Sequence, residues 1–317
     1  MNGVIVIDHL VKTFGSVRAV DDLSFTVRPG RVTGFLGPNG AGKTTTLRIL
    51  LGLVSATAGT ATIGGSTYGH ITPPMQAVGA ALEAASFHPG RTALDHLRVY
   101  APQAGVSDAR CREVLDFVGL GTVAGRRAGG FSLGMRQRLA LATTLLGDPP
   151  VLLLDEPANG LDPEGIAWLR LLLRHLAAEG RTVLVSSHVL SEVEQTVDDV
   201  VIIARGRLVH SSSLAELAAL AEPSVRVISP DAAGLQRLIT ATGWADRVEP
   251  AVVGQEGVAV IRRVTAAEIG ARAFAAGLEL HELVSRDVGL EGIFLQLVGE
   301  DVGAEVAEPH LEAGGGR

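Results

Sequence analysis

Hydrophobic and polar residues alternate at the start of the chain and then give way to continuous apolar runs. The alternation over residues 4–11 and 23–27 predicts two half-buried strands of a small antiparallel sheet. Residues 31–36 are largely apolar and end in a glycine-rich loop, after which a helical pattern begins at Lys43. This part of the chain is therefore predicted to fold as a strand, a loop and a helix.

A mostly helical pattern follows over residues 79–147. Two short apolar strands are then predicted at 151–154 and 183–186, on either side of an amphipathic helix at 163–178. Short apolar strands joined by a helix are typical of a parallel sheet. We therefore expect residues 1–220 to form one α/β domain that contains an inserted helical region.

The remaining chain is predicted to form a second, smaller domain. Strands are expected at 225–228, 258–261 and 278–284, with helices between them. These elements predict a small α+β domain over residues 223–300. Residues 301–317 are rich in Gly, Ala and Glu and are expected to be disordered.

Composition narrows the class of protein. The chain has 317 residues and a formal net charge of −7, which argues against a nucleic-acid partner. Its mean hydropathy is +0.31, yet no apolar run approaches the roughly 18 residues of a membrane span. The first residues do not resemble a secretory leader. Cys111 has no second cysteine to pair with, which fits a reducing compartment. We expect a cytoplasmic protein.

The loop after the strand at 31–36 matches the pattern GxxxxGKT. In this pattern backbone N–H groups wrap a phosphate, and the lysine reaches the β- and γ-phosphates. A glycine-rich turn without a ligand is the alternative, but the position between a strand and a helix favours nucleotide. The predicted nucleotide-binding residues are Gly37, Pro38, Asn39, Gly40, Ala41, Gly42, Lys43, Thr44 and Thr45. Thr44 is also expected to bind Mg²⁺ through its hydroxyl.

Two carboxylates follow the strand at 151–154. Asp155 is predicted to contact Mg²⁺, usually through water, and Glu156 to orient or deprotonate the attacking water. Two solvated loop carboxylates would be the alternative reading. The phosphate-binding loop upstream favours ATP hydrolysis, with Glu156, Lys43 and a histidine discussed below as catalytic residues.

The segment Phe131-Ser132-Leu133-Gly134-Met135 is similar to the LSGGQ signature of ABC ATPases. Leu133 and Met135 depart from the usual Gly and Gln, whereas Ser132 and Gly134 keep the expected residue types. The resemblance implies that Ser132 and Gly134 close over the ATP held by a partner subunit. A Ser that only caps a helix is the alternative for Ser132.

Other positions match the same family in order. His188 resembles the family's switch histidine, which contacts the γ-phosphate and the catalytic carboxylate. Asp162, in the segment 159–162, resembles the D-loop at the dimer interface, and Phe14 occupies the place of an aromatic residue that stacks on adenine. The alternatives are a lone histidine without a functional role for His188 and core packing for Phe14.

The family's Q-loop glutamine has no clear counterpart. Glu83 is the best match and would bind nucleotide and Mg²⁺, and Gln76 is a weaker candidate. The alternative for Glu83 is a solvated glutamate on the surface without a functional role. A glutamate at this place resembles the pattern of a subgroup of bacterial antibiotic and peptide exporters that work with ABC-2-type permeases. The segment 290–295 resembles the C-terminal motif of drug-exporter ATPases.

The resemblance implies a RecA-like P-loop ATPase core with an antiparallel β-subdomain and a helical subdomain, followed by the small α+β domain. It implies ATP and Mg²⁺ as cofactors, a homodimer, and a separate transmembrane permease that carries a drug, antibiotic or lipid-like substrate. The chain would then lie peripherally on the inner face of the cell membrane. An ABC ATPase acting on ribosomes or DNA, and a degenerate cassette that binds ATP without hydrolysing it, are the rival readings.

Overall fold

The computed structural model describes residues 3–82, 87–190, 194–220, 223–248, 256–286 and 290–303. Contacts between residues divide the chain into two compact units. The first comprises residues 1–214 together with 294–317, and the second comprises residues 215–293.

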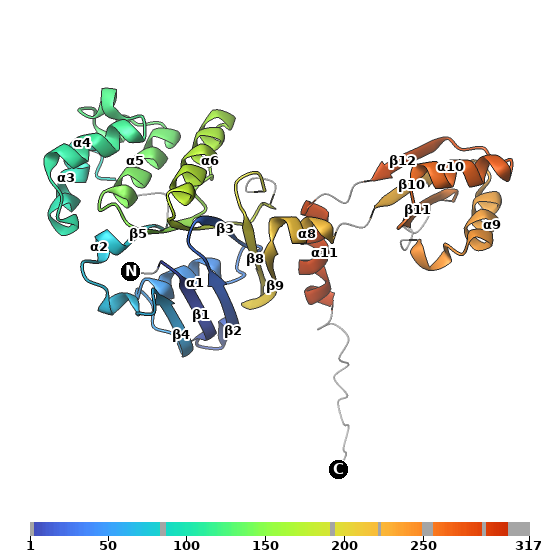
Figure 1. Cartoon of the computed structure of the whole chain (residues 1–317), viewed down its shortest axis with the longest axis horizontal. Helices are drawn as coiled ribbons and strands as arrows, with labels where there is room; N and C mark the ends of the chain where they lie inside the picture. The colour runs from blue at the N-terminus through green and yellow to red at the C-terminus, as the bar shows by residue number, and fades with distance from the viewer. Residues whose placement is uncertain are drawn as a thin grey trace, which may run out of the picture. The chain divides into compact units, whose positions relative to one another are not determined.

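The first unit opens with a three-stranded antiparallel sheet of order β2-β1-β4 (Figure 1). Its strands are β1 (Ile5–Phe14), β2 (Val17–Val27) and β4 (Ala58–Ile63). The predicted strands overlap β1 and β2: β1 begins one residue later than predicted, and both observed strands are longer than the alternation indicated. Ile5 and Ile7 are buried in the core, because alternate residues of a strand share one face. A register irregularity between Ile7 and Leu10 lets Leu10 be buried as well.

A six-stranded sheet of order β5-β6-β7-β3-β8-β9 forms the centre of the unit. Neighbouring strands are parallel except for β9, which pairs antiparallel with β8 at the edge. Parallel strands end at one edge of a sheet, so the loops after β3, β6 and β7 meet there. The strands are β3 (Arg31–Leu36), β5 (Val78–Ala81), β6 (Val151–Asp155), β7 (Thr182–Ser187), β8 (Asp199–Ala204) and β9 (Arg207–Ser213).

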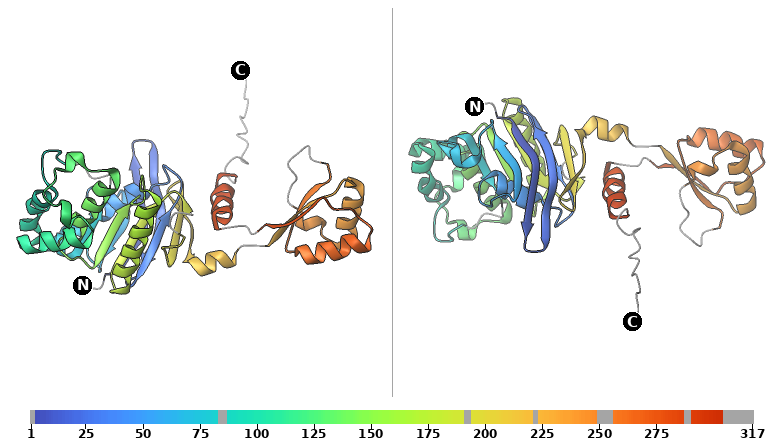
Figure 2. Two further views of the ribbon diagram at one scale, coloured as in Figure 1. Left: turned by 90° about the horizontal axis from the view of Figure 1, so that it is seen from above. Right: turned by 90° about the horizontal axis from the view of Figure 1, so that it is seen from below.

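Helices flank this sheet. Two opposite views show α6 on one face and the β1–β2 pair on the other (Figure 2). The main apolar core lies between the two sheets and includes Phe35, Leu47 and Leu153. The helices of the first unit are α1 (Lys43–Leu50), α2 (Pro74–Ala77), α3 (Ala93–Ala104), α4 (Asp108–Phe117), α5 (Leu133–Leu145) and α6 (Pro163–Ala178), and 3₁₀ turns lie at Tyr68–His70, Gly121–Val123 and Ala128–Gly130. Helix α8 (Leu214–Ala219) begins at the last residue of residues 1–214 and otherwise belongs to the second unit.

The predicted helical region is wrong at its start, because residues 79–81 belong to β5. This strand pairs in parallel with β6. A Cβ at Gly79 would lie 2.3 Å from the carbonyl oxygen of Thr144, in helix α5. A glycine therefore lets the strand pack closely against α5, and pairing with β6 decides the conformation.

The second unit has its own sheet and core. The sheet order is β11-β10-β12, antiparallel throughout, and helices α9 and α10 contribute Leu235, Ile239 and Ile269 to a core with Val227 and Ile261. The elements are β10 (Ser224–Ile228), α9 (Ala232–Thr242), a 3₁₀ turn at Ala245–Arg247, β11 (Val258–Arg262), α10 (Ala266–Ala275) and β12 (Glu282–Arg286).

The end of the chain departs from two predicted boundaries. The third strand of the small domain was predicted at 278–284, but β12 begins at Glu282. Helix α11 (Leu290–Gly303) continues past the predicted start of the tail at residue 301. Residues 304–317 of that predicted tail lie outside the described residues.

Candidate nucleotide-binding and hydrolysis site

The glycine loop follows β3 and leads directly into α1, as its sequence predicted. Gly40 and Gly42 adopt φ angles of 81° and 104°, a region that residues with a side chain rarely enter. A Cβ at Gly42 would also lie 2.4 Å from the Ala19 carbonyl oxygen. The conformation of the loop therefore requires glycine at these positions. The loop ends at the N-terminus of α1, where the partial positive charge of the helix favours binding of an anion.

Lys43 lies beneath this loop, and only 5% of it is exposed. Its Nζ donates hydrogen bonds to the carbonyl oxygens of Gly37 at 2.6 Å and Pro38 at 3.3 Å. The same Nζ lies 3.6 Å from Glu156 Oε1. Burial lowers the pKa of Lys43, and the charge of Glu156 opposes that shift. The ammonium is thus held inside the loop that would surround a phosphate.

Asp155 is the last residue of β6, and it contacts two neighbouring elements. Its Oδ2 accepts a hydrogen bond from Thr44 Oγ1 at 2.7 Å, and Ser186 Oγ of β7 donates to Oδ1. A hydroxyl and a carboxylate oxygen are ligands that Mg²⁺ accepts, and Mg²⁺ usually takes few protein ligands and completes its shell with phosphate and water. In the described part of the chain, no group of three or more His, Cys, Asp or Glu side chains is arranged so that it could hold a metal ion by itself. The donors present fit a Mg²⁺–nucleotide complex.

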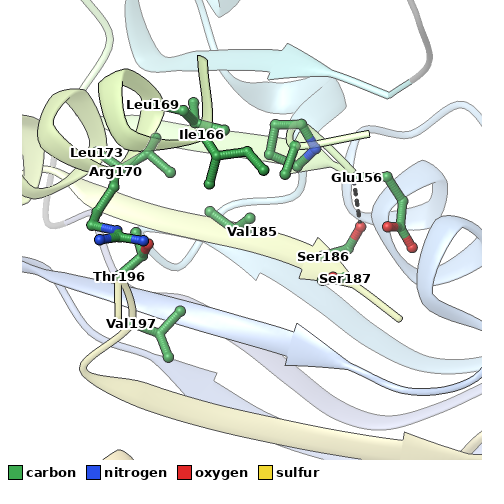
Figure 3. Close-up of a pocket in the computed structure, with 12 residues that line it drawn as sticks. Glu156, Ile166, Leu169, Arg170, Leu173, Val185, Ser186, Ser187, Thr196 and Val197 are labelled. Atoms are coloured by element: carbon green, nitrogen blue, oxygen red, sulfur yellow. Dashed lines mark hydrogen bonds between the residues drawn. The ribbon is translucent and has the colours of Figure 1, made fainter. Parts of the chain in front are cut away.

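Glu156 has a positive φ of 49°, unusual for a residue with a side chain. Its backbone N–H donates to Ser186 Oγ at 2.9 Å, a contact drawn in Figure 3. Its Oε2 lies 2.9 Å from His188 Nδ1, and Oε1 faces Lys43. The structure therefore brings Lys43, Thr44, Asp155, Glu156 and His188 into one connected cluster.

A small cavity lies behind Glu156, between α6 and β7 (Figure 3). Its volume is about 20 Å³, enough for a water molecule but not for a nucleotide. Its walls are mostly apolar, with Ile166, Leu169 and Val185 among them. This cavity therefore cannot hold the nucleotide.

The signature segment starts helix α5 and lies beside the D-loop. Ser132 caps the helix, because its Oγ accepts a hydrogen bond from the Met135 N–H at 3.2 Å. Leu133 packs on Gly160, and a Cβ added to Gly160 would lie 2.2 Å from Leu133 Cδ2. Gly134 lies close to the side chain of Leu161. Asp162 caps α6 by accepting from the Gly165 N–H at 2.8 Å. These contacts form a second cluster, separate from the one around Lys43.

The remaining predicted residues have mixed outcomes. Phe14 ends β1 and is 49% exposed, so it is not a core residue. Thr45 lies in the first turn of α1. Glu83 falls outside the described residues. Gln76, its weaker rival, donates from Nε2 to the Ala104 carbonyl oxygen at 2.9 Å, which ties α2 to the end of α3.

Sequence reasoning missed two residues that organise the site. Ser186 holds both Asp155 and the Glu156 backbone, and Gln137 Nε2 donates to the Pro157 carbonyl oxygen at 2.9 Å. Ser186 stands in the apolar strand just before His188, which is the one local signal that marks it. Gln137 carries no such signal. It links the signature helix to the loop after Glu156.

Comparisons with known proteins decide the family. A family model described as ABC transporter matches residues 20–159. The bacitracin transport ATP-binding protein BcrA of Bacillus licheniformis is 43% identical over 213 residues, covering 66% of this chain and 70% of that protein. The chain belongs to the ABC transporter ATP-binding proteins. As a member of this family, the ABC ATPase binds ATP and hydrolyses it.

Other relatives extend the match. The lantibiotic transport ATP-binding protein SrtF of Streptococcus pyogenes is 37% identical and covers 64% of this ABC ATPase and 88% of that protein. The Nod factor export ATP-binding protein I of Ralstonia nicotianae is 33% identical over 94% of this chain and 95% of its own. A second model, for a domain of unknown function, matches residues 223–291. The similarity to the Nod factor export protein therefore includes the second unit.

Solved structures agree with the fold. The structure of the ATP-binding subunit of an ABC transporter has a TM-score of 0.62 at 27% identity, covering 68% of this chain and 92% of that one. A dimeric ATP-binding cassette bound to ADP and Pi has a TM-score of 0.60 at 23% identity and shares the fold. None of the helices in the described residues is long and apolar enough to cross a membrane.

Proposed function

We propose that this ABC ATPase powers export of a drug, antibiotic or lipid-like substrate through a separate membrane permease. The observation that carries the proposal is the 43% identity to a bacitracin transport protein, together with a nearly full-length match to an export protein. The chain would work peripherally, on the inner face of the cell membrane. Residues 1–220 would form the ATPase domain, 223–300 an accessory domain and 301–317 a disordered tail.

The residues of the Lys43 cluster suit ATP hydrolysis. Lys43 and residues 37–45 would hold the phosphates, and Thr44 and Asp155 would hold Mg²⁺, which neutralises developing phosphate charge when bound. Glu156 would orient the attacking water and accept its proton. His188 supports this role, since its hydrogen bond fixes the Glu156 carboxylate on the side facing Lys43.

The signature cluster suits a second copy of the chain. Ser132 and Gly134 begin a helix whose N-terminus favours an anion, and their contacts join them to Leu161 and the D-loop rather than to Lys43. We propose that they cover the ATP held by a partner subunit, with Asp162 at the interface of the homodimer. The related fold that was solved as a dimer supports this assembly.

Glu83 is proposed as the Q-loop residue, which would contact nucleotide and Mg²⁺ and sense the permease. A carboxylate is a favourable ligand for Mg²⁺, so it would strengthen the dependence of ATP binding on the metal. Glu83→Gln should soften that dependence, as measured by nucleotide titrations at several Mg²⁺ concentrations. An unchanged Mg²⁺ dependence would make Glu83 a surface residue.

Export is tested in cells that carry the chain and its permease. Deletion of the ATPase gene should lower the resistance of the cells to bacitracin or to a lantibiotic. Restoration by the wild-type chain, but not by Glu156→Gln, would tie that resistance to hydrolysis. The tagged wild-type chain should be recovered from detergent-solubilised membranes together with a permease. Recovery with ribosomes instead, with no change of resistance, would favour the non-transport class of ABC ATPase.

A further inference from the structure

Lysine is rare in this chain, and both lysines lie near the predicted nucleotide site. Of the 27 Lys and Arg residues only Lys12 and Lys43 are lysines. Lys43 belongs to the phosphate loop. Lys12 belongs to β1, two residues before Phe14, and no step proposed above uses it.

Lys12 lies against the ring of Phe14. Residues two apart in a strand share a face, and Lys12 Nζ lies 4.6 Å from the centroid of the Phe14 ring. This is the geometry of a cation–π interaction, which attracts a cation to the face of an aromatic ring. The same Nζ donates a hydrogen bond of 2.8 Å to the carbonyl oxygen of Ser55.

The Ser55 contact fixes Lys12 to the loop that joins α1 to β4. Two further bonds tie the end of β1 to this loop, from the Thr13 N–H to Thr57 Oγ1 at 3.1 Å and from the Thr57 N–H to the Val11 carbonyl oxygen at 2.8 Å. The Phe14 ring is therefore coupled to the segment that follows the phosphate-binding helix α1.

We propose that Lys12 is a positioning residue of the adenine subsite. It holds one face of the half-exposed Phe14 ring and leaves the uncovered part of the ring for the base to stack on. An exposed ring near a strand end would otherwise exchange between rotamers, and adenine would have to fix it on binding. The inference rests on the proposed role of Phe14 in binding adenine.

Lys12→Met in the full chain tests the proposal, because methionine keeps the unbranched stem and removes the charge and the donor. ATP affinity should fall about 2–5-fold, the range of an exposed cation–π contact, while kcat at saturating ATP stays unchanged. The affinity for inorganic tripolyphosphate with Mg²⁺ should not change. Lys12→Arg, which keeps a cation and donors, should restore ATP affinity.

Arg28→Met is the matched control, since it removes an exposed cation just beyond β2, at the end of the β1–β2 pair away from Phe14. It should leave both affinities unchanged. Equal weakening of tripolyphosphate binding in Lys12→Met would show that Lys12 acts on the phosphates and would overturn the inference. Unchanged ATP affinity in that variant would overturn it as well.

Phe14→Ala separates this inference from the assignments on which it rests. Stacking on an aromatic ring predicts a loss of about 5–150-fold in ATP affinity, and adding Lys12→Met to Phe14→Ala should cost nothing more. If Phe14→Ala binds ATP like the wild type, the adenine subsite lies elsewhere and Lys12 does not position it. Hydrolysis that still depends on Glu156 would leave the ATPase assignment intact.

Discussion

The backbone at Glu156 is turned into a conformation that costs a residue with a side chain of the order of 1–3 kcal/mol. Ser186 compensates in part by accepting a hydrogen bond from the Glu156 N–H. The turn directs the carboxylate toward Lys43 and His188 rather than into solvent. The strained backbone conformation of Glu156 is therefore what places its carboxylate in the site.

Glu156→Gln should abolish most hydrolysis and spare ATP binding. The amide keeps the size and one oxygen of the side chain but cannot accept a proton, so the rate should fall roughly 10²–10⁴-fold, the usual contribution of a general base. Phosphate release and a nucleotide titration measure the two effects. Lys43→Ala is the contrasting variant, which should lose affinity for ATP itself. A wild-type rate in Glu156→Gln would require another base.

His96 gives the first unit a measurable pH dependence. Its ring is buried between Phe87 and Tyr100, and its Nδ1 has no hydrogen-bond partner among the described residues. Burial lowers the pKa of His96 from 6.5 to about 4. Between pH 6.5 and 4, His96 is protonated in the unfolded chain but stays neutral in the folded chain. The free energy of unfolding should therefore decrease as the pH falls from 6.5 to 4.

His96→Leu should flatten this part of the stability curve. A lowering of this size corresponds to roughly 3 kcal/mol between pH 6.5 and 4, and leucine has no proton to gain. Denaturant unfolding of both proteins at several pH values measures the difference. The comparison cancels the carboxylates that titrate in both. Parallel curves for the two proteins would show that His96 is protonated while folded.

The site residues divide into those that the sequence made predictable and those that it did not. Gly37–Thr44, Asp155 and Glu156 belong to contiguous motifs, so their chemistry could be inferred from order alone. Ser186 and Gln137 act on residues that are distant in sequence, across β7 and from α5. Such contacts depend on strand order and helix packing, which a local pattern does not determine.

At the level of elements, three helices of the first unit begin with capping side chains. Ser132 caps α5, Asp162 caps α6 and Thr92 caps α3, each by accepting a backbone N–H three residues on. The rival reading of Ser132 as an ordinary cap is thus structurally correct. A capping role does not exclude a second one, because the same helix N-terminus favours an anion from a partner subunit.

Ser132→Ala and Thr92→Ala should separate these two roles. Each removes one cap and should lower the free energy of unfolding by about 0.5–2 kcal/mol. Only Ser132→Ala should also reduce steady-state ATP hydrolysis, because Thr92 lies outside both clusters of the site. Unfolding curves and ATPase rates of the two variants provide the comparison. Equal ATPase rates would leave Ser132 with the cap alone.

The elements were predicted best where a strong apolar run had clear ends, as in β3, β6 and β7. The strand β12 was predicted too early because Leu278 and Leu280 are apolar. They pack on the core of the second unit from a segment that is not yet a strand. Gly277, with a φ of 65°, ends the turn after α10, and pairing with β10 begins only at Glu282. In this segment burial begins at Leu278, whereas strand pairing begins only at Glu282.

At the level of the whole molecule, the nucleotide motifs and the second unit are separate. The residues of the Lys43 cluster and of the signature cluster lie within residues 1–214, while residues 215–293 have a sheet and an apolar core of their own. A unit with its own core is expected to contribute little to a binding site that is built from residues of the other unit. We propose that it contributes instead to assembly with a second copy or with the permease.

A chain that ends at Leu220 should therefore still bind ATP. It keeps both sheets of the first unit, the glycine loop, Asp155, Glu156 and His188. It loses residues 294–317, which group with the first unit, so a lower free energy of unfolding is expected and folding must be verified first by circular dichroism. Calorimetric titration should then give an affinity for Mg²⁺–ATP close to that of the full chain.

Lys43→Ala in the same shortened chain is the control for specific binding. A folded shortened chain without ATP affinity would show that the region after Leu220 takes part in the nucleotide site, and the division of the chain proposed above would be wrong.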